Sequence, residues 1–322
     1  MKTRHLRVVI TFLIHLPFPR FRENHSPARD TAMSRDTAVV LFARLPVPGK
    51  AKTRLAKDVG PDAAADLYRR MAERAFAATA SSSRATSRTL CFSEASEAEG
   101  IQRWVEAMGD TSLRLAPQCA SPDLGERMRH ALTRALERGG EGGGPCAKAI
   151  VVGTDVPDLS AAHVDAAAAA LDDHDVVFGP AVDGGYYLLG VRRPPAVARA
   201  GGDAGVEGGG DAEAATGTGE GSESEKALVS PRLFHGVPWS TETVLRDSLV
   251  AARGAGLKAA RESTLPRLRD VDVLEDVAAW VAKAGEPPNA AGNRKDDAFL
   301  AAARALLTKR KSHPEARDAS AS

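Results

Sequence analysis

Short continuous apolar runs alternate along the chain with stretches in which apolar residues recur every three or four positions. Continuous runs are typical of strands buried on both faces of a parallel sheet, and the recurring positions are typical of amphipathic helices. The runs predict strands at residues 37–43, 89–92, 113–116, 149–152 and 175–178. The recurring positions predict helices at residues 61–78, 101–108, 124–135, 161–171, 241–255, 273–284 and 296–307. This alternation predicts an α/β domain with a mostly parallel central sheet flanked by helices.

One interruption of this pattern lies inside the predicted domain. Residues 200–226 contain nine glycines and almost no large apolar side chain, so they bury too little surface to offset the entropy of ordering. The pattern of strands and helices resumes afterwards, which indicates a disordered, glycine-rich insertion at residues 200–227. We therefore expect a single folded domain at residues 37–284, followed at residues 285–322 by a C-terminal helix and a polar tail.

Residues 1–36 differ from the rest of the chain, and we expect them to lie outside the folded domain. Residues 1–35 contain seven Lys and Arg but only two acidic residues. The apolar run Val8–Phe18 is shorter than the ~20 residues that a membrane span needs. Three origins fit this segment: an organelle transit peptide, a secretory signal peptide, or sequence upstream of a start at Met33. We expect a cytoplasmic protein, or a plastid or mitochondrial one if the segment is a transit peptide.

Composition and charge exclude several classes of protein. A hydrophobic fraction of 43% with 26% charged residues allows a packed core and excludes global disorder. The formal net charge of +1 lacks the basic excess that nucleic-acid binding usually requires, and we expect no nucleic-acid partner and no membrane span. The three cysteines, Cys91, Cys119 and Cys146, are too dispersed for a disulfide framework or a structural zinc site.

The loop after the first predicted strand is basic and contains two prolines and a glycine. Its sequence, RLPVPGKAKTR, places Arg44, Lys50, Lys52 and Arg54 between a strand and a helix. Backbone N–H groups and cationic side chains at such a turn can bind a diphosphate. The loop lacks both the GxxxxGK[ST] pattern and the GxGxxG dinucleotide pattern. It is either a phosphate-binding loop or an ordinary basic surface loop.

A carboxylate follows the strongest buried run, AIVV at residues 149–152. The next residues, 153–159, read GTDVPDL and place Asp155 just beyond the predicted strand. Mg²⁺ and Mn²⁺ are commonly held by one or two carboxylates together with phosphate oxygens and water. We expect Asp155 to bind such an ion, whereas Asp158 or Ser160 would cap the next helix.

Residues 183–187, DGGYY, combine a turn with aromatic side chains. Gly184 and Gly185 permit a positive φ or the close approach of a ligand, and Tyr186 follows them directly. A hairpin turn at Asp-Gly with tyrosines in the core is the alternative interpretation. The hairpin and the ligand role are compatible with each other.

Two further candidate segments lie late in the chain. In PWSTE, at residues 238–242, Trp239 offers a flat apolar face for a sugar or base, and Ser240 or Thr241 would cap a following helix. A hydrophobic staple at a helix start explains the tryptophan equally well. In DVD, at residues 270–272, a carboxylate could be a second metal ligand or another helix cap.

Six segments, taken in order, resemble one known family. They are FARLPVPGKAKTRL at residues 42–55, DLGERM at 123–128, GTDVPDL at 153–159, GPAVDGGYYLLG at 179–190, PWST at 238–241 and DVDVLED at 270–276. Together they resemble the small GT-A glycosyltransferase-like proteins associated with arsenosugar biosynthesis and with selenium-linked radical-SAM gene neighbourhoods. That family belongs to the nucleotide-diphospho-sugar transferase superfamily, in which the guanylyltransferases for molybdenum cofactor and for 2-phospholactate are more distantly similar. The resemblance implies a Rossmann-like GT-A fold from about residue 37 to residue 280.

The resemblance also implies roles for the residues at matching positions. The basic residues of the first loop would contact the nucleotide phosphates: Lys50, Lys52 and Arg54, with Arg44 beside them. Asp155 would bind the metal ion, and Asp272 would add a metal contact. Asp183 would face the sugar or acceptor and is our candidate catalytic base. The residues expected on the sugar or acceptor side are Gly184, Gly185, Tyr186, Trp239, Ser240 and Thr241.

We therefore expect a glycosyltransferase that depends on Mg²⁺ or Mn²⁺. It would move a sugar from a nucleotide-diphosphate sugar donor to a small-molecule acceptor. A nucleotidyltransferase that joins an NTP to a phosphorylated small molecule and releases pyrophosphate is one alternative. A catalytically idle nucleotide-binding protein is the other. No pattern in the sequence specifies an oligomeric state.

Overall fold

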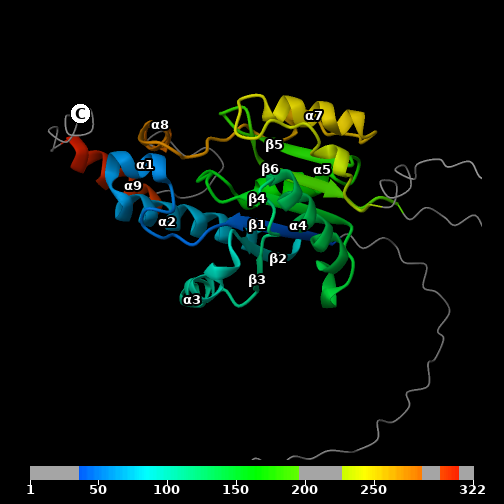
Figure 1. Ribbon diagram of the computed structural model, residues 1–322, viewed down its shortest axis with the longest axis horizontal. Coiled ribbons are helices and arrows are strands. Elements are labelled where there is room, and N and C mark those ends of the chain that lie inside the picture. The colour runs from blue at the N-terminus through cyan, green and yellow to red at the C-terminus, as the bar shows by residue number, and fades with distance from the viewer. Residues whose placement is uncertain (1–35, 196–226, 285–297, 312–322) are drawn as a thin grey trace, which may run out of the picture. The chain divides into compact units, whose positions relative to one another are not determined.

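The computed structural model describes residues 36–195, 227–284 and 298–311. Within them, six strands form one sheet in the order β3-β2-β1-β4-β6-β5 (Figure 1). The strands are β1 Thr37–Ala43, β2 Ala85–Phe92, β3 Leu113–Pro117, β4 Lys148–Gly153, β5 Val176–Pro180 and β6 Tyr186–Arg192. β1 pairs in parallel with β2 and β4, and β2 with β3, whereas β6 runs antiparallel to both of its neighbours. The predicted α/β class with a mostly parallel sheet is confirmed.

Helices cover both faces of the sheet (Figure 1). They are α1 Thr53–Val59, α2 Pro61–Ala80, α3 Ala98–Met108, α4 Leu124–Arg138, α5 Ala161–Ala170, α7 Val244–Gly254, α8 Leu274–Ala284 and α9 Ala298–Lys311. Val39 and Leu41 of β1 pack in the core cluster that includes side chains of α2, α3 and α5. Ala38 and Val40, which alternate with them, pack in the cluster that includes α4 and α7. Burial on both faces explains why this strand is a continuous apolar run.

Two local features differ from the sequence prediction, and one decides between its alternatives. Helix α1 begins at Thr53, inside the segment expected to be a loop. Strand β6 forms a hairpin with β5, which confirms the hairpin interpretation of DGGYY. Helix α7 begins at Val244 with Thr243 at its N-cap, so the prediction that Ser240 or Thr241 caps it is wrong. The reason is a turn before the helix, in which Ser240 has a left-handed φ of 66°.

The C-terminal helix expected at residues 296–307 is found at Ala298–Lys311. It packs beside α2 and α8, and Figure 1 shows its red ribbon next to the blue α2. The rings of Trp280 and Phe299 meet edge to face with centroids 4.8 Å apart, and both side chains are buried. This helix therefore completes the core on the α2 face of the sheet.

Several predictions fall outside the described residues. These are the N-terminal extension up to residue 35, the insertion within residues 196–226, and residues 285–297 and 312–322. They stay predictions. Among the residues that the structure describes, no helix is both long enough and apolar enough to cross a membrane.

Candidate functional site

A cleft opens where the parallel strands β1 and β4 end. The two neighbours end at Ala43 and Gly153, at the edge of the sheet where α/β proteins bind their ligands. The cleft has a volume of about 640 Å³. All of the residues predicted for the site except Gly184 line it, namely Arg44, Lys50, Lys52, Arg54, Asp155, Asp183, Gly185, Tyr186, Trp239, Ser240, Thr241 and Asp272. Segments far apart in the sequence thus contribute to one cavity.

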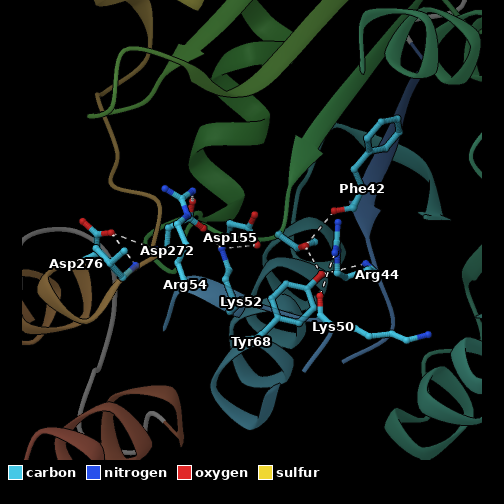
Figure 2. Close-up of polar contacts among 11 residues, drawn as sticks. Phe42, Arg44, Lys50, Lys52, Arg54, Tyr68, Asp155, Asp272 and Asp276 are labelled. Atoms are coloured by element: carbon cyan, nitrogen blue, oxygen red, sulfur yellow. Dashed lines mark hydrogen bonds and ion pairs between the residues drawn. The ribbon is translucent and has the colours of Figure 1, made fainter. Parts of the chain in front are cut away.

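Lys52 lies at the centre of the charged part of the cleft (Figure 2). Its Nζ atom is 3.1 Å from Oδ1 of Asp155 and 2.5 Å from Oδ1 of Asp272. Arg54 pairs with the other oxygen of Asp272. Lys50 is exposed and extends away from this cluster, toward the side where Arg44 lies (Figure 2). The basic loop therefore divides into a paired group, Lys52 and Arg54, and a second group formed by Arg44 and Lys50.

The backbone of the loop directs Lys52 into the cleft. Lys52 adopts the left-handed conformation with φ 49° and ψ 51° at the N-cap of α1. This conformation is uncommon for a residue with a side chain and carries strain of about 1 kcal/mol or more. Ala51 before it and Leu55 after it are fully buried and anchor the loop on both sides. Hydrophobic anchoring thus holds a strained lysine whose side chain is only 6% exposed.

Both members of the Lys52–Asp272 pair are charged at neutral pH. Burial by itself would lower the pKa of Lys52, but Asp155 and Asp272 raise it, and the net pKa lies above the usual value. Burial would raise the pKa of Asp272, but Lys52 and Arg54 lower it, and the net pKa lies below the usual value. Each partner therefore stabilises the charged form of the other.

Asp270 is a site residue that the sequence identified only as one of several late carboxylates. It lines the same cleft, and burial, then the charges of Asp183 and Asp272, raises its pKa to about 6. The sequence DVD does not predict the partial burial of Asp270, because that burial depends on the fold of the chain. Asp183, Asp270 and Asp272 together give this part of the cleft an excess of negative charge.

A buried hydroxyl network connects the two loops that carry Lys52 and Asp155. The backbone N–H of Arg44 donates to the Tyr68 hydroxyl at 3.1 Å, and that hydroxyl lies 3.1 Å from Oγ1 of Thr154. Thr154 in turn donates to the carbonyl oxygen of Phe42 at 3.0 Å. Burial raises the pKa of Tyr68 to about 12, so its hydroxyl stays protonated. Tyr68 was missed by the sequence analysis, although a polar hydroxyl among the apolar positions of a helix was a signal for it.

The carboxylates of the cleft fit a divalent ion that arrives with phosphates. Asp155 and Asp272 both lie within 3.1 Å of the Lys52 ammonium, so they face one point, and the Asp155 side chain is 46% exposed. Among the described residues, no group of three or more His, Cys, Asp or Glu is placed to hold a metal ion. A closed protein cage is therefore not present in these parts of the chain. One or two carboxylates completed by phosphate oxygens and water are the usual donor set for Mg²⁺.

Trp239 forms another part of the cleft lining, against the start of α4. Its indole Nε1 donates to Oδ2 of Asp123 at 3.0 Å, while Oδ1 of Asp123 accepts the N–H of Glu126 at 2.7 Å. Asp123 thus caps α4 and orients the indole at the same time. A Cβ atom added to Gly125 would lie 2.8 Å from the Trp239 ring. This contact explains the glycine in the segment DLGERM.

The turn between β5 and β6 places Asp183 at the cleft. Gly184 has a φ of 90°, and a Cβ atom on it would lie 2.0 Å from the carbonyl oxygen of Glu242. The expectation that Gly184 contacts the sugar or acceptor finds no support, because this glycine packs against the backbone before α7. Asp183 is exposed, and its Oδ1 accepts the N–H of Gly185 at 2.9 Å. The glycine pair therefore shapes the turn that carries the carboxylate.

The two carboxylates of GTDVPDL have different positions. Asp155 faces Lys52 in the cleft, whereas Asp158 accepts the indole N–H of Trp280 at 2.9 Å. Ser160, the other candidate cap, is at the N-cap of α5 in a reciprocal capping arrangement with His163. Of the two candidate caps, Ser160 is therefore the residue at the N-cap of α5.

Comparisons with known proteins agree with this fold. Residues 76–200 match the family described as "Uncharacterized protein conserved in bacteria (DUF2064)". The chain is similar to the "putative nucleotide-diphospho-sugar transferase" of Desulfovibrio desulfuricans G20, with 26% identity and a TM-score of 0.63, covering 87% of this chain and 96% of that chain. A cytidylyltransferase of Leptospira borgpetersenii serovar Hardjo-bovis is 12% identical, with a TM-score of 0.41, covering 88% of this chain and 96% of that chain. A search of the curated proteins found no significant match.

The likeness to the Desulfovibrio protein extends over most of both chains. The chain therefore has the fold of the nucleotide-diphospho-sugar transferases, as expected from its six motif segments. The narrower resemblance, to proteins associated with arsenosugar biosynthesis or radical-SAM neighbourhoods, stays a prediction.

Proposed function

We propose that this chain is a nucleotide-utilising transferase that moves a sugar from a nucleotide-diphosphate sugar to a small-molecule acceptor. The observation that supports this most is the 3.1 Å contact between Lys52, from the loop after β1, and Asp155, from the loop after β4. A cation and a carboxylate at the carboxyl edge of a parallel sheet are the groups that a metal-bound diphosphate requires. The fold shared with the Desulfovibrio protein supports the same class of ligand.

The charge balance around Lys52 favours a metal-dependent reaction. The positive charges of Lys52 and Arg54 are matched by Asp155 and Asp272, and Asp270 adds further negative charge. An anionic diphosphate would therefore meet no net positive charge in this part of the cleft unless a cation accompanied it. Mg²⁺ or Mn²⁺ held by Asp155, with Asp272 as a second carboxylate, would supply positive charge to the leaving diphosphate.

In the proposed reaction, an acceptor hydroxyl oxygen forms a bond to the anomeric carbon of the sugar. The bond from that carbon to the diphosphate oxygen breaks, and the electron pair leaves with the nucleoside diphosphate. The hydroxyl proton passes to a carboxylate, for which we propose the exposed Asp183. Tyr186 and Trp239 line the same cleft and offer faces against which a sugar or acceptor could pack. Gly185, Ser240 and Thr241 lie on this side as well.

Nucleotidyl transfer is the alternative reaction that the same groups could serve. There, a phosphorylated small molecule would attack the α-phosphate of an NTP, and pyrophosphate would leave. Both reactions place a metal-bound diphosphate as the leaving group, so the charged part of the cleft does not distinguish them. A nucleotide-binding protein without turnover would use the same charged groups.

The products separate these functions. The full chain would be incubated with Mn²⁺ and a panel of UDP, GDP and CDP sugars plus candidate acceptors, and separately with NTPs plus phosphorylated acceptors. Release of a nucleoside diphosphate with a glycosylated product supports our proposal, whereas release of pyrophosphate supports nucleotidyl transfer. Nucleotide binding without either product would contradict both. Asp155→Asn should abolish the reaction, and the matched control Asp62→Asn, in the exposed first turn of α2, should not.

A further inference from the structure

The Lys52 ammonium lies at the point where two candidate metal ligands converge. It contacts Asp155 at 3.1 Å and Asp272 at 2.5 Å, and the side chain is only 6% exposed. The position is fixed from the backbone, because the left-handed Lys52 lies between the buried Ala51 and the buried Leu55. A positive charge that belongs to the protein therefore already offsets part of the negative charge of the carboxylates that a divalent ion would use.

We infer that Lys52 competes with the divalent ion for Asp155 and Asp272, so that metal binds well only together with a diphosphate. This inference rests on the proposed function for the identity of the second ligand. A divalent ion and the ammonium would repel each other at such short range in a partly buried site. A diphosphate would relieve this repulsion, because its anionic oxygens can accept the Lys52 ammonium while the ion holds the carboxylates.

When a metal ion takes the carboxylates, Lys52 should move to a new anionic partner and not remain without one. Arg54 also pairs with Asp272, but its side chain is 68% exposed and is weakly held. Lys52, by contrast, is nearly enclosed, so it needs an anionic partner in every state of the cleft. Binding of metal and binding of diphosphate should therefore strengthen each other by the same factor.

The competition can be measured by Mn²⁺ binding alone. Metal-free full chain would be titrated with Mn²⁺ at constant pH, and free Mn²⁺ would be followed by electron paramagnetic resonance. Lys52→Met should bind Mn²⁺ at least ~10-fold more tightly than the wild type, because the competing charge is gone. The matched control Lys57→Met removes an exposed lysine from the same helix and should leave the affinity unchanged. Equal affinities for the wild type and Lys52→Met would overturn the inference.

A second variant and a second measurement distinguish the effect of the lost charge from an effect on folding. Lys52→Gln keeps a hydrogen-bond donor beside the carboxylates without the charge, and it should show the same tightening. Mn²⁺ should also raise the melting temperature of both variants more than that of the wild type. If only Lys52→Met bound Mn²⁺ more tightly than the wild type, the cause would be steric, and the proposed competition would be contradicted.

Mn²⁺ titrations with added nucleoside diphosphates test whether metal and diphosphate binding are coupled. They also distinguish failure of this inference from failure of the proposed function. After subtraction of the Mn²⁺ that the nucleotides bind in the absence of protein, a mixture of GDP, UDP and CDP should raise the Mn²⁺ affinity of the wild type at least ~10-fold, and the gain should shrink in Lys52→Met. If Lys52→Met binds Mn²⁺ more tightly but no nucleotide affects either protein, the competition holds and the proposed function fails. If nucleotide and Mn²⁺ bind to the wild type independently, the function can hold but the coupling through Lys52 is wrong.

Discussion

Two lysines, equally buried, lie at opposite ends of the sheet and have different surroundings. Lys148, the first residue of β4, is 5% exposed, donates to the carbonyl oxygen of Ala168 at 2.8 Å and pairs with Asp172. Lys52, 6% exposed, lies beyond the end of β1 and contacts two carboxylates. The first lysine is satisfied by one carboxylate and one carbonyl oxygen, whereas the second shares a cleft with several acids.

The difference shows how burial of a charge relates to its role. At Lys148, the ammonium contacts the carbonyl oxygen of Ala168 and the carboxylate of Asp172, and this single carboxylate also pairs with Arg84 at 3.4 Å. At Lys52, two carboxylates compete for one ammonium, and Asp270 remains nearby with a pKa of about 6. Several acids gathered at the carboxyl edge of a sheet are typical of a binding site, whereas a lysine whose carboxylate partner is shared with another cation at the amino edge is typical of structural stabilisation.

Asp155→Asn should have the largest effect of any substitution considered. The loss of one carboxylate charge at the proposed diphosphate site should lower turnover by at least ~100-fold, while the fold is retained because Asp155 caps no helix. Turnover would be measured with the donor identified by the product screen, and folding by circular dichroism. Full activity in this variant would contradict the assignment of Asp155.

Lys148→Met should show the opposite pattern. It removes the ion pair with Asp172 and the bond to Ala168, so the free energy of unfolding should fall by about 2–3 kcal/mol. Activity per folded molecule should stay at the wild-type level. Denaturant unfolding and single-concentration kinetics would check both. An activity loss without destabilisation would break the contrast between the two lysines.

Asp270→Asn should stabilise the protein at high pH and leave it unchanged in acid. The native pKa of about 6 lies above the usual 3.8, so the folded state holds this proton more tightly than the unfolded state does. Stability of the wild type should therefore fall as pH rises from about 4 to about 6, and the variant should escape that loss. With allowance for solvent screening, we expect a gain of about 2 kcal/mol at pH 8 and none at pH 4.

Metal-free unfolding curves at several pH values would check this prediction. Asp62→Asn, an exposed carboxyl in the first turn of α2, is the matched control and should show no comparable pH-dependent gain. A variant of Asp270 that is equally stable at pH 4 and pH 8 would show that its carboxyl is not strained in the native cleft.

Gly125→Ala should change the free energy of unfolding least, but whether it stabilises or destabilises the protein is informative. Alanine normally stabilises a helix by about 1 kcal/mol relative to glycine. Here the added Cβ would lie 2.8 Å from both the Trp239 ring and the Phe234 Cβ, so we expect a net loss of about 1 kcal/mol. Gly254→Ala, in α7 with open space around it, should instead be neutral or slightly stabilising. Thermal unfolding of the two variants would show whether Trp239 is held as tightly as the geometry indicates.

The sequence predicted more of the fold than of the site. Apolar runs and recurring positions located β1, β4, α2 and α4, because these patterns follow directly from burial on one or two faces. Helix α1 was missed, since only tertiary burial of Leu55 and Ala51 makes the short segment helical. Local propensity alone is weak for so short an element.

The sequence could predict which residues line the site, but not which of them contact one another. Lys52 and Asp155 were expected in the cleft because loops after neighbouring parallel strands meet at one edge, whereas Asp272 was expected only from the family resemblance. That Lys52 bridges both carboxylates depends on its left-handed backbone, which no local pattern predicted. The raised pKa of Asp270 depends on its burial beside other acids, which is a property of the folded chain.

The most direct test of the account is calorimetric binding of GDP, UDP and CDP with and without Mn²⁺. At least one of them should bind the wild type, binding should require Mn²⁺, and Asp155→Asn should weaken it at least ~100-fold. Diphosphate binding that needs neither Mn²⁺ nor Asp155, or no binding under any of these conditions, would contradict it.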